Sequence, residues 1–277
     1  RWSPRLQDLY FEGCISVSAL GRARFPRLEH LDLINTLPQP FTAHLGHLPP
    51  RTAFFGLQNA VLVHPGDPPS LTAAGTLVAR PDAPSASSPG ALPALGEPAV
   101  MGEQASARAL AAGVQSLSLM KGVMWVDMGG RQMLGWAASC SMLTSLRVEF
   151  PLGQWEESIR GQPTTPLAAL AAAPRLQYVD VMFVDSGEGS EGLLDTRLTR
   201  DLAAITRLEE LEVWTRGVGD WHEDISFLPL TACKRLRSLK LEVMPHLHCI
   251  VAREVLAEAL PGCRLRLVAH HMGPLMN

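Results

Sequence analysis

The chain has 277 residues, of which 47% are hydrophobic and 18% are charged, and its formal net charge is −3. This length and hydrophobic content fit one large domain or two small ones with a continuous core. The slightly acidic balance gives no electrostatic support for nucleic-acid binding, and no run approaches the ~18 apolar residues of a membrane span. We therefore expect neither nucleic acid nor membrane as a partner.

A short motif recurs along the chain: a leucine, two variable residues, a second leucine, one variable residue and a final apolar residue. Most copies begin 22 to 33 residues after the previous one. Self-similarity at a nearly fixed period is typical of solenoid proteins. The copies are Leu6-Leu9-Phe11, Leu28-Leu31-Leu33, Val114-Leu117-Leu119, Leu143-Leu146-Val148, Leu176-Val179-Val181, Leu208-Leu211-Val213 and Leu236-Leu239-Leu241, with weaker copies at Leu57-Ala60-Leu62 and Leu265-Leu267.

The stretch 64–98 interrupts the repeats. It holds eight prolines together with many Ala, Ser and Gly residues, a composition that predicts an inserted, poorly ordered loop. A decayed repeat around Leu71–Leu77 is the alternative. We expect a helix within Ala99–Ala112 to lead into the next strand, so that residues 1–277 form a single domain.

Several of the motifs follow a helix-like stretch, so one repeat is expected to hold one strand and one helix. Alternation within the motif places its apolar side chains on one face of a short strand. A lone strand cannot bury that face, whereas stacked repeats bury it between a parallel sheet and a layer of helices. The expected helices are Gln132–Ser139, Pro166–Ala172, Leu198–Ile205 and Ile250–Leu260.

These repeats resemble the leucine-rich-repeat family over nearly all of the chain except residues 64–98. The resemblance implies an α/β fold, a right-handed horseshoe-shaped solenoid with parallel strands on the concave wall and helices on the convex wall. The first repeat, residues 6–15, is also similar to the cysteine-containing repeats of F-box proteins, with Cys14 at the position usually held by Asn or Cys. The other repeats depart from that subtype and carry Thr36, Gly122, Pro151, Val184, Arg216 and Met244 there.

The solvent-facing side of the predicted sheet is the candidate binding surface. Solvated strands favour polar residues, so large apolar side chains expected on this side indicate a partner protein, a covering segment or packing among themselves. The charges on the same side either steer a charged partner or pair between neighbouring strands, and we favour pairing. The predicted partner-binding residues are Tyr10, Met120, Tyr178, Met182, Trp214, Glu212, Lys240 and Arg266.

Two further sets of residues are interpreted as structural. Large apolar residues follow several strands at a similar distance, and we expect them to fill the core at one rim, with partner binding as the alternative. Cys140 and Cys233 occupy an otherwise apolar or small column, so we expect both to be buried. The first set is Met124, Trp125, Trp155 and Trp221.

Motifs for catalysis or metal binding are weak. His246 and His248 on a strand would share one face, but the spacing of a zinc module is missing. The acidic stretch 185–195 lacks the alternating ligands of a calcium loop because Gly187 is its third residue. No phosphate loop, nucleophile elbow or HExxH motif occurs. We therefore expect no enzyme, no catalytic residue, no metal site and no cofactor.

The sequence predicts a protein-protein interaction scaffold that binds its partner on the concave face. One alternative is the substrate-recognition part of an F-box-type ubiquitin ligase, joined to an adaptor through a segment before residue 1. The other is a non-catalytic repeat region attached to an enzyme outside this sequence. Five scattered cysteines without a CxxC pair favour a reducing compartment, so we expect an intracellular, cytoplasmic protein. The start Arg-Trp-Ser-Pro lacks Met and a signal peptide, so we expect a truncated N-terminus that hides any organelle signal.

Overall fold

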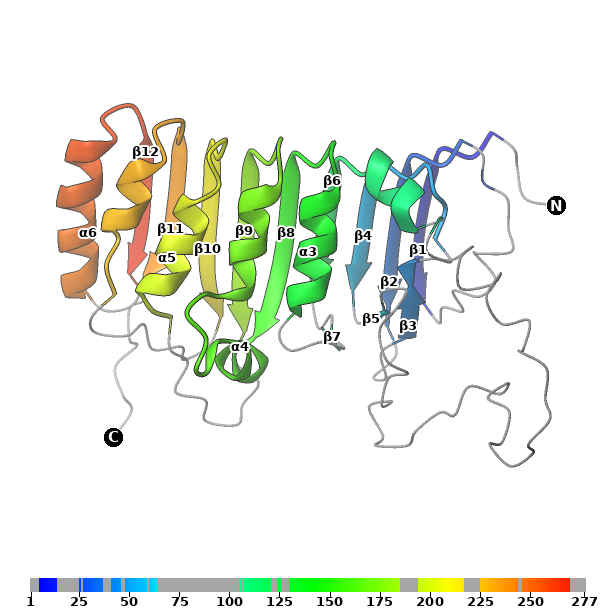
Figure 1. Ribbon diagram of the computed structural model, residues 1–277, viewed down its shortest axis with the longest axis horizontal. Helices are drawn as coiled ribbons and strands as arrows, with labels where there is room; N and C mark the ends of the chain where they lie inside the picture. The colour runs from blue at the N-terminus through cyan, green and yellow to red at the C-terminus, as the bar shows by residue number, and fades with distance from the viewer. Residues whose placement is uncertain are drawn as a thin grey trace, which may run out of the picture.

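The structure is a computed structural model, in which strands and helices stack along one direction (Figure 1). No helix in the described part of the chain is long and apolar enough to cross a membrane. The described residues are 5–13, 25, 27–36, 41–45, 48–58, 60–63, 105, 107–120, 124–125, 130–184, 194–216, 225–243 and 246–269.

The main sheet has nine strands, and every neighbouring pair in it is parallel. Each strand lies beside that of the preceding repeat, which is the arrangement of a solenoid. The strands, in spatial order, are β1 (Asp8–Gly13), β2 (His30–Asn35), β4 (Phe54–Gln58), β6 (Ser116–Met120), β8 (Ser145–Pro151), β9 (Tyr178–Val184), β10 (Glu210–Arg216), β11 (Ser238–Val243) and β12 (Arg264–Ala269).

A second, three-stranded parallel sheet was not predicted. It consists of β3 (Phe41–His44), β5 (Ala60–Val63) and β7 (Met124–Trp125), in that spatial order. Each of these short strands follows a main-sheet strand in the chain, namely β2, β4 and β6. Within the described residues, the second, third and fourth repeats therefore hold two strands each.

In the part of the chain that the structure describes, the helices lie on one face of the main sheet and leave the other face open (Figure 1). All four predicted helices are present, although the second is a 3-10 helix, and residues 107–113 are helical as expected within 99–112. The helices are α3 (Arg131–Ser139), α4 (Leu152–Ile159), η3 (Pro166–Ala172), α5 (Thr196–Ala203), η4 (Leu228–Ala232) and α6 (His246–Ala259), of which α4 lies at the end of β8 and was not predicted.

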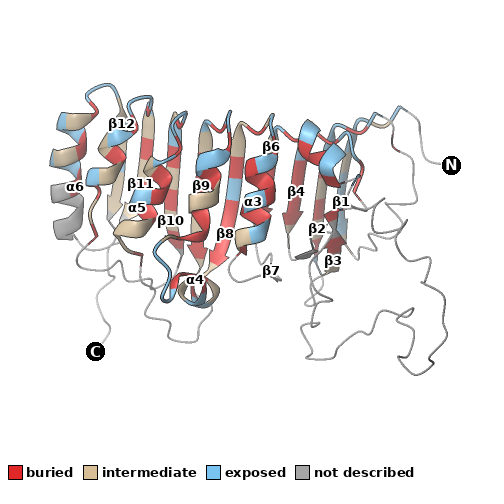
Figure 2. Ribbon diagram, in the orientation of Figure 1, coloured by how far each residue is buried: buried red, intermediate tan, exposed pale blue. Residues whose placement is uncertain are grey.

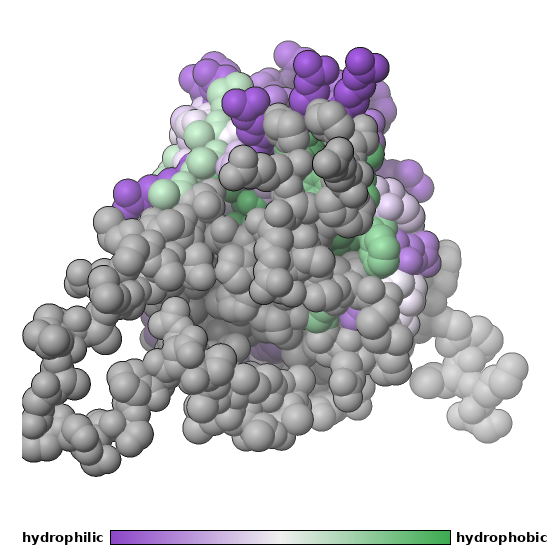
Figure 3. All heavy atoms as spheres, turned by 90° about the vertical axis from the view of Figure 1, so that its right-hand side faces the viewer, coloured by the Kyte–Doolittle hydropathy of each residue, from purple (hydrophilic) through white to green (hydrophobic). Residues whose placement is uncertain are grey.

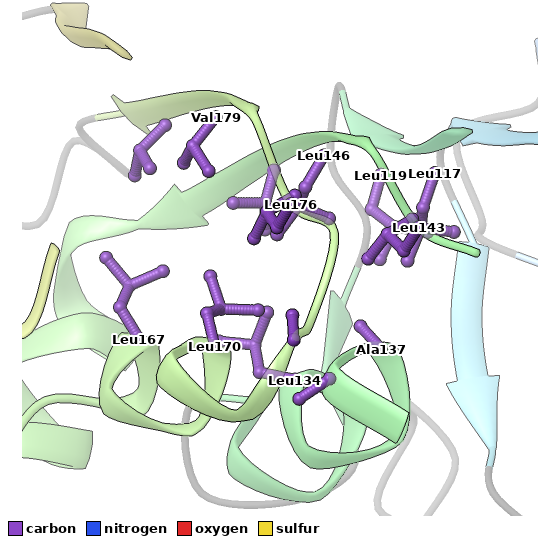
Figure 4. Packing of buried hydrophobic residues seen from close by; sticks show 14 of the residues in the cluster. Leu117, Leu119, Leu134, Ala137, Leu143, Leu146, Leu167, Leu170, Leu176 and Val179 are labelled. Carbon is purple, nitrogen blue, oxygen red and sulfur yellow. The ribbon is translucent and has the colours of Figure 1, made fainter. Parts of the chain in front are cut away.

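The hydrophobic core lies between the main sheet and the helices. Strand residues such as Leu117, Leu146 and Val179 face Leu134 of α3 and Leu170 of η3, and all five side chains are fully buried (Figure 4). Buried residues alternate with partly exposed ones along the strands (Figure 2). A fully buried Leu or Val contributes ~1.5–3 kcal/mol, so the motif residues stabilise the inner repeats most, whereas Phe11 of the first repeat is 43% exposed. The predicted α/β solenoid, with parallel strands in one layer and helices in the other, is confirmed.

The edge at which the main-sheet strands begin, at the top of Figure 1, carries a continuous backbone ladder. The N–H groups of Glu29 and His30 both donate to the carbonyl of Gln7, at 2.8 and 2.9 Å, and later repeats continue the same pattern. The ladder ends with Arg264, whose N–H donates to the carbonyl of Arg237 at 2.8 Å. We call this edge the strand-entry rim, and its hydrogen bonds hold successive repeats at one sheet spacing.

The third repeat corrects the sequence analysis. Phe55 and Leu57 pair with the second and third motif positions of the neighbouring strands, so this motif begins at Thr52 and the predicted copy Leu57-Ala60-Leu62 was wrong. Thr52 is fully buried, and its hydroxyl donates to the carbonyl of Pro49 at 3.0 Å. This hydrogen bond allows a polar residue to replace the expected leucine.

The corrected frame also shows how the interruption fits the sheet. Strand β4 pairs directly with β6, although residues 64–98 separate the two strands in the chain. The predicted poorly ordered loop lies outside the described residues and stays a prediction.

The corrected frame puts Gly56 beside Asp32 on the open face. A Cβ atom at Gly56 would lie 2.5 Å from the Oδ1 atom of Asp32, although the backbone of Gly56 does not need a positive φ. We expect Gly56→Ala to lower the free energy of unfolding by about 1 kcal/mol, because Asp32 must move. In an Asp32→Ala background the loss should disappear. Urea unfolding of the four proteins measures this coupling, and an equal loss in both backgrounds would contradict it.

Candidate functional site

The open face of the main sheet, which we call the strand face, presents three outward positions per strand. The pairing of the strands aligns these positions across all nine repeats. Strands β4 and β6 present small residues at the middle position, whereas β8 to β12 present charged ones. The middle positions are Tyr10, Asp32, Gly56, Ser118, Arg147, Asp180, Glu212, Lys240 and Arg266.

Trp214, Glu212 and Lys240 form one compact group on β10 and β11. The Nζ atom of Lys240 lies 3.3 Å from the centre of the Trp214 ring and 3.8 Å from Oε2 of Glu212. The indole N–H of Trp214 donates to the same Oε2 atom at 3.1 Å. An ammonium group over an indole face gains electrostatic energy from the ring. The Lys240 side chain is consequently held, and only 17% of it is exposed.

Arg147, Tyr178 and Asp180 form a second, looser group on β8 and β9. The Nε atom of Arg147 lies 3.5 Å from Oδ2 of Asp180, and its Nη2 atom donates to the Tyr178 hydroxyl at 3.3 Å. The guanidinium carbon lies 5.6 Å from the centre of the Tyr178 ring. With 55% of its side chain exposed, Arg147 is the most accessible charge of the two groups.

The Asp180 carboxylate sits in an unfavourable environment for a charge. Its side chain is 11% exposed, and its buried Oδ1 atom has no hydrogen-bond partner. Burial is the main cause that raises the pKa of Asp180, Glu212 on the next strand raises it further, and Arg147 acts in the opposite direction. The two groups meet at Asp180 and Glu212, which are register partners.

We call these six residues, Arg147, Tyr178, Asp180, Glu212, Trp214 and Lys240, the β8–β11 cluster. The structure brings together the predicted residues Tyr178, Glu212, Trp214 and Lys240. Met182 lies beside this cluster as the register partner of Trp214. The sequence analysis did not select Arg147 and Asp180 as site residues. Arg147 and Asp180 carry opposite charges at the same motif position of neighbouring repeats. This pattern in the sequence could have identified both residues.

The other predicted site residues lie outside the cluster. Arg266 is exposed on β12 as the register partner of Lys240, and Met120 is half-buried on β6. Tyr10 is 61% exposed on β1, where its hydroxyl donates to Glu12 at 3.0 Å, and this hydrogen bond is the main cause that raises its pKa. The favoured interpretation that charges pair between strands is confirmed at Arg147–Asp180 and Lys240–Glu212.

The residues interpreted as structural are buried wherever they are described. Trp155 is fully buried, as expected of a core-filling residue, and it lies on α4 rather than in a loop. Cys140 and Cys233 are buried too, and burial raises their pKa values to about 12 and about 11. The side chains of Met124 and Trp125, and the whole of Trp221, lie outside the described residues.

Among the described residues, no group of three His, Cys, Asp or Glu side chains could hold a metal ion. His246 and His248 belong to helix α6, so their placement on a strand was wrong. A long stretch after Pro245 favours a helix because it can bury one apolar stripe, which includes Ala252 and Leu256, against the sheet. Residues 185–193 of the acidic stretch lie outside the described part, whereas Asp195 caps α5 by accepting from the Arg197 N–H at 2.8 Å.

No family model matches the sequence, and no curated protein matches it. A search of solved structures finds a plant peptide hormone receptor, RGFR1, in complex with RGF2, with a TM-score of 0.39 and 12% sequence identity. The match covers 96% of this chain and 37% of the receptor chain, so the chain spans little more than a third of that receptor's length. The fold assignment rests on the strand order and register described above.

Proposed function

We propose that the chain is a scaffold that binds another protein on its strand face, centred on the β8–β11 cluster. The observation that carries the proposal is the position of Trp214, Tyr178 and Arg147 on a sheet face that no helix of the described residues covers. Tryptophan, tyrosine and arginine are the residue types most enriched at binding hot spots. A solvated strand face does not need them for folding.

The size of the strand face supports the same function. Nine strands at ~4.8 Å spacing span ~38 Å, and strands of about six residues are ~20 Å long. The product is ~800 Å², which is about the area per partner in a standard protein interface. A partner that covers most of this face would therefore make a stable contact.

The internal contacts of the cluster also favour binding. Lys240 and Glu212 hold the Trp214 ring in place before any partner arrives. A side chain that is already fixed loses little conformational entropy on association. Trp214 is therefore a preorganised anchor, and Met182 beside it extends the apolar contact.

The test uses a partner captured by the purified chain from a cell extract and then purified itself. We expect Trp214→Ala to raise the dissociation constant at least tenfold, and Trp214→Ala with Met182→Ala to raise it further, because hot-spot residues dominate affinity. Leu228→Ala is the matched control, since Leu228 is 61% exposed on the helix layer. Calorimetric titration measures the affinities, and circular dichroism checks the fold. Unchanged affinity of the folded variant that combines Trp214→Ala and Met182→Ala would contradict the proposal.

Two finer assignments belong to this proposal. The scaffold carries no catalytic step of its own and works in a reducing compartment, where buried Cys140 and Cys233 stay free thiols. Hydrolase activity or bound metal in the purified chain would contradict the assignment as a non-catalytic scaffold. Secretion of the native protein would contradict the assignment to a reducing compartment.

The ubiquitin-ligase alternative rests only on the resemblance of the first repeat, and Cys14 lies outside the described residues. It requires an F-box module before residue 1 that contacts the ligase adaptor. The upstream gene sequence tests this directly, because a coding region without such a module removes the alternative.

A further inference from the structure

A column of arginines lies on the strand-entry rim, away from the strand face. The residue immediately before the first motif position is arginine in six of nine repeats, and Arg51 joins the column only in the corrected frame of the third repeat. All six side chains are exposed. They form two runs, Arg5, Arg27 and Arg51 beside β1, β2 and β4, and Arg175, Arg207 and Arg235 beside β9, β10 and β11.

The backbone ladder fixes how these arginines are spaced. Each arginine lies two residues before a residue of the ladder, for example Arg207 before Glu209, whose N–H donates to the carbonyl of Gln177 at 2.8 Å. Neighbouring repeats are ~4.8 Å apart at this edge. Each run is therefore a straight file of three arginines that spans ~10 Å at the backbone.

The second run is the centre of a basic surface. Residues 174–177, 206–209 and 234–237 contain five basic side chains and one acidic side chain, whereas the whole chain has a net charge of −3. The acidic one, Glu209, lies 3.5 Å from Arg237, which is 78% exposed. A hollow of about 560 Å³ opens here between Lys234, Arg235, Arg237 and Cys263. At the other end of the same rim, hydrophilic residues gather at the top of Figure 3.

We propose that the arginine file Arg175–Arg207–Arg235 binds a short acidic segment of a protein, laid along the strand-entry rim across the repeats. Guanidinium groups bind carboxylates through paired hydrogen bonds, so a file of arginines fits a chain of Asp or Glu residues. In an extended chain, acidic side chains at alternate positions point to the same side, and three of them at ~3.4 Å per residue span ~14 Å, enough to cover the file.

The interruption of the column favours a peptide over a nucleic acid. Gly113 and Met142 occupy the arginine position in the two repeats between the runs. A nucleic acid gains affinity from each of its phosphates that the protein neutralises, so a long nucleic acid would favour a continuous stripe of basic residues. A short segment needs only one run. The rim is also a different surface from the strand face, so this proposal stands independently of the proposed function.

The experiment measures binding of a fluorescein-labelled peptide of alternating glutamate and serine to the purified chain by fluorescence anisotropy, at low and at high salt. We expect salt-sensitive binding that weakens at least tenfold when Arg207→Glu and Arg235→Glu are combined, because reversal places like charges opposite the peptide. Trp214→Ala should leave this binding unchanged.

The matched control combines Arg160→Glu and Arg253→Glu, which makes the same change in net charge at two exposed arginines off the rim. Its affinity should stay within twofold of the wild type. An equal loss in both double variants would show that only net charge matters and would overturn the proposal. So would failure of the wild type to bind the peptide, or binding of an RNA oligomer or of phosphatidylserine vesicles instead. Thermal unfolding checks that each variant is folded.

Discussion

Replacing Trp155 by alanine should lower the free energy of unfolding by about 3–5 kcal/mol, the usual cost of truncating a buried aromatic residue. Trp155 is fully buried on α4, and its ring centre lies 5.1 Å from that of Phe150 and 4.9 Å from that of Phe183. Phe150 and Phe183 lie next to each other on β8 and β9. The tryptophan therefore joins α4 to two repeats, and its loss would leave a cavity at the end of both strands.

Trp155→Phe separates the aromatic packing from the indole group. The buried indole N–H has no hydrogen-bond partner, so phenylalanine loses volume but also removes an unsatisfied donor. We expect a loss below about 1.5 kcal/mol for this variant. Urea unfolding followed by circular dichroism measures both variants, with exposed Leu228→Ala as the neutral control. A loss below about 1 kcal/mol for Trp155→Ala would contradict the central position of this residue.

The second large effect is expected at Asp201 on α5. Its Oδ2 atom accepts a hydrogen bond of 2.6 Å from the backbone N–H of Thr165, and both residues are buried. Asp201→Ala should lower the free energy of unfolding by about 2–3 kcal/mol, because it leaves that N–H buried without a partner. Asp201→Asn keeps an acceptor oxygen and should cost about half as much. Equal losses in the two variants would show that the carboxylate does not act as the acceptor.

The Thr165 contact is part of a larger set that holds the segment 158–165 between α4 and η3. Arg131 of α3 donates to the carbonyls of Ser158 and Thr164 at 3.1 and 2.7 Å. Arg197 of α5 donates to those of Ile159 and Gln162 at 2.8 and 2.6 Å. Side chains from the repeats on either side thus satisfy backbone carbonyls at the end of α4 and in the turn that follows it. The large effect expected for Asp201→Ala follows from this dependence.

The binding surface and the rim give the solenoid two candidate contacts of different chemistry. The strand face offers the aromatic residues Trp214 and Tyr178 among paired charges. The strand-entry rim offers the arginines Arg175, Arg207 and Arg235 with few acidic neighbours. The two contacts can be told apart, because Trp214→Ala should weaken binding at the strand face alone and reversal of Arg207 and Arg235 should weaken binding at the rim alone.

The sequence alone determined the solenoid, because its signals are local. Alternating apolar residues such as Leu117 and Leu119 specify a strand with one buried face, and the same residue column recurs in most of the repeats. The buried positions of Cys140 and Cys233 followed from that column. The predicted site residues on β9, β10 and β11 also fell on one face, since a strand repeats its side-chain direction every two residues.

Only the tertiary structure decided features that depend on contacts between repeats. The frame of the third repeat rests on the hydrogen bond that lets Thr52 replace a leucine, and local pattern gives no sign of it. Helix α4 forms where Trp155 can pack on Phe150 and Phe183 of neighbouring strands. Arg147 and Asp180 are about thirty residues apart in the chain, and only the parallel register makes them partners. Long-range packing energy, rather than propensity, selects these pairs.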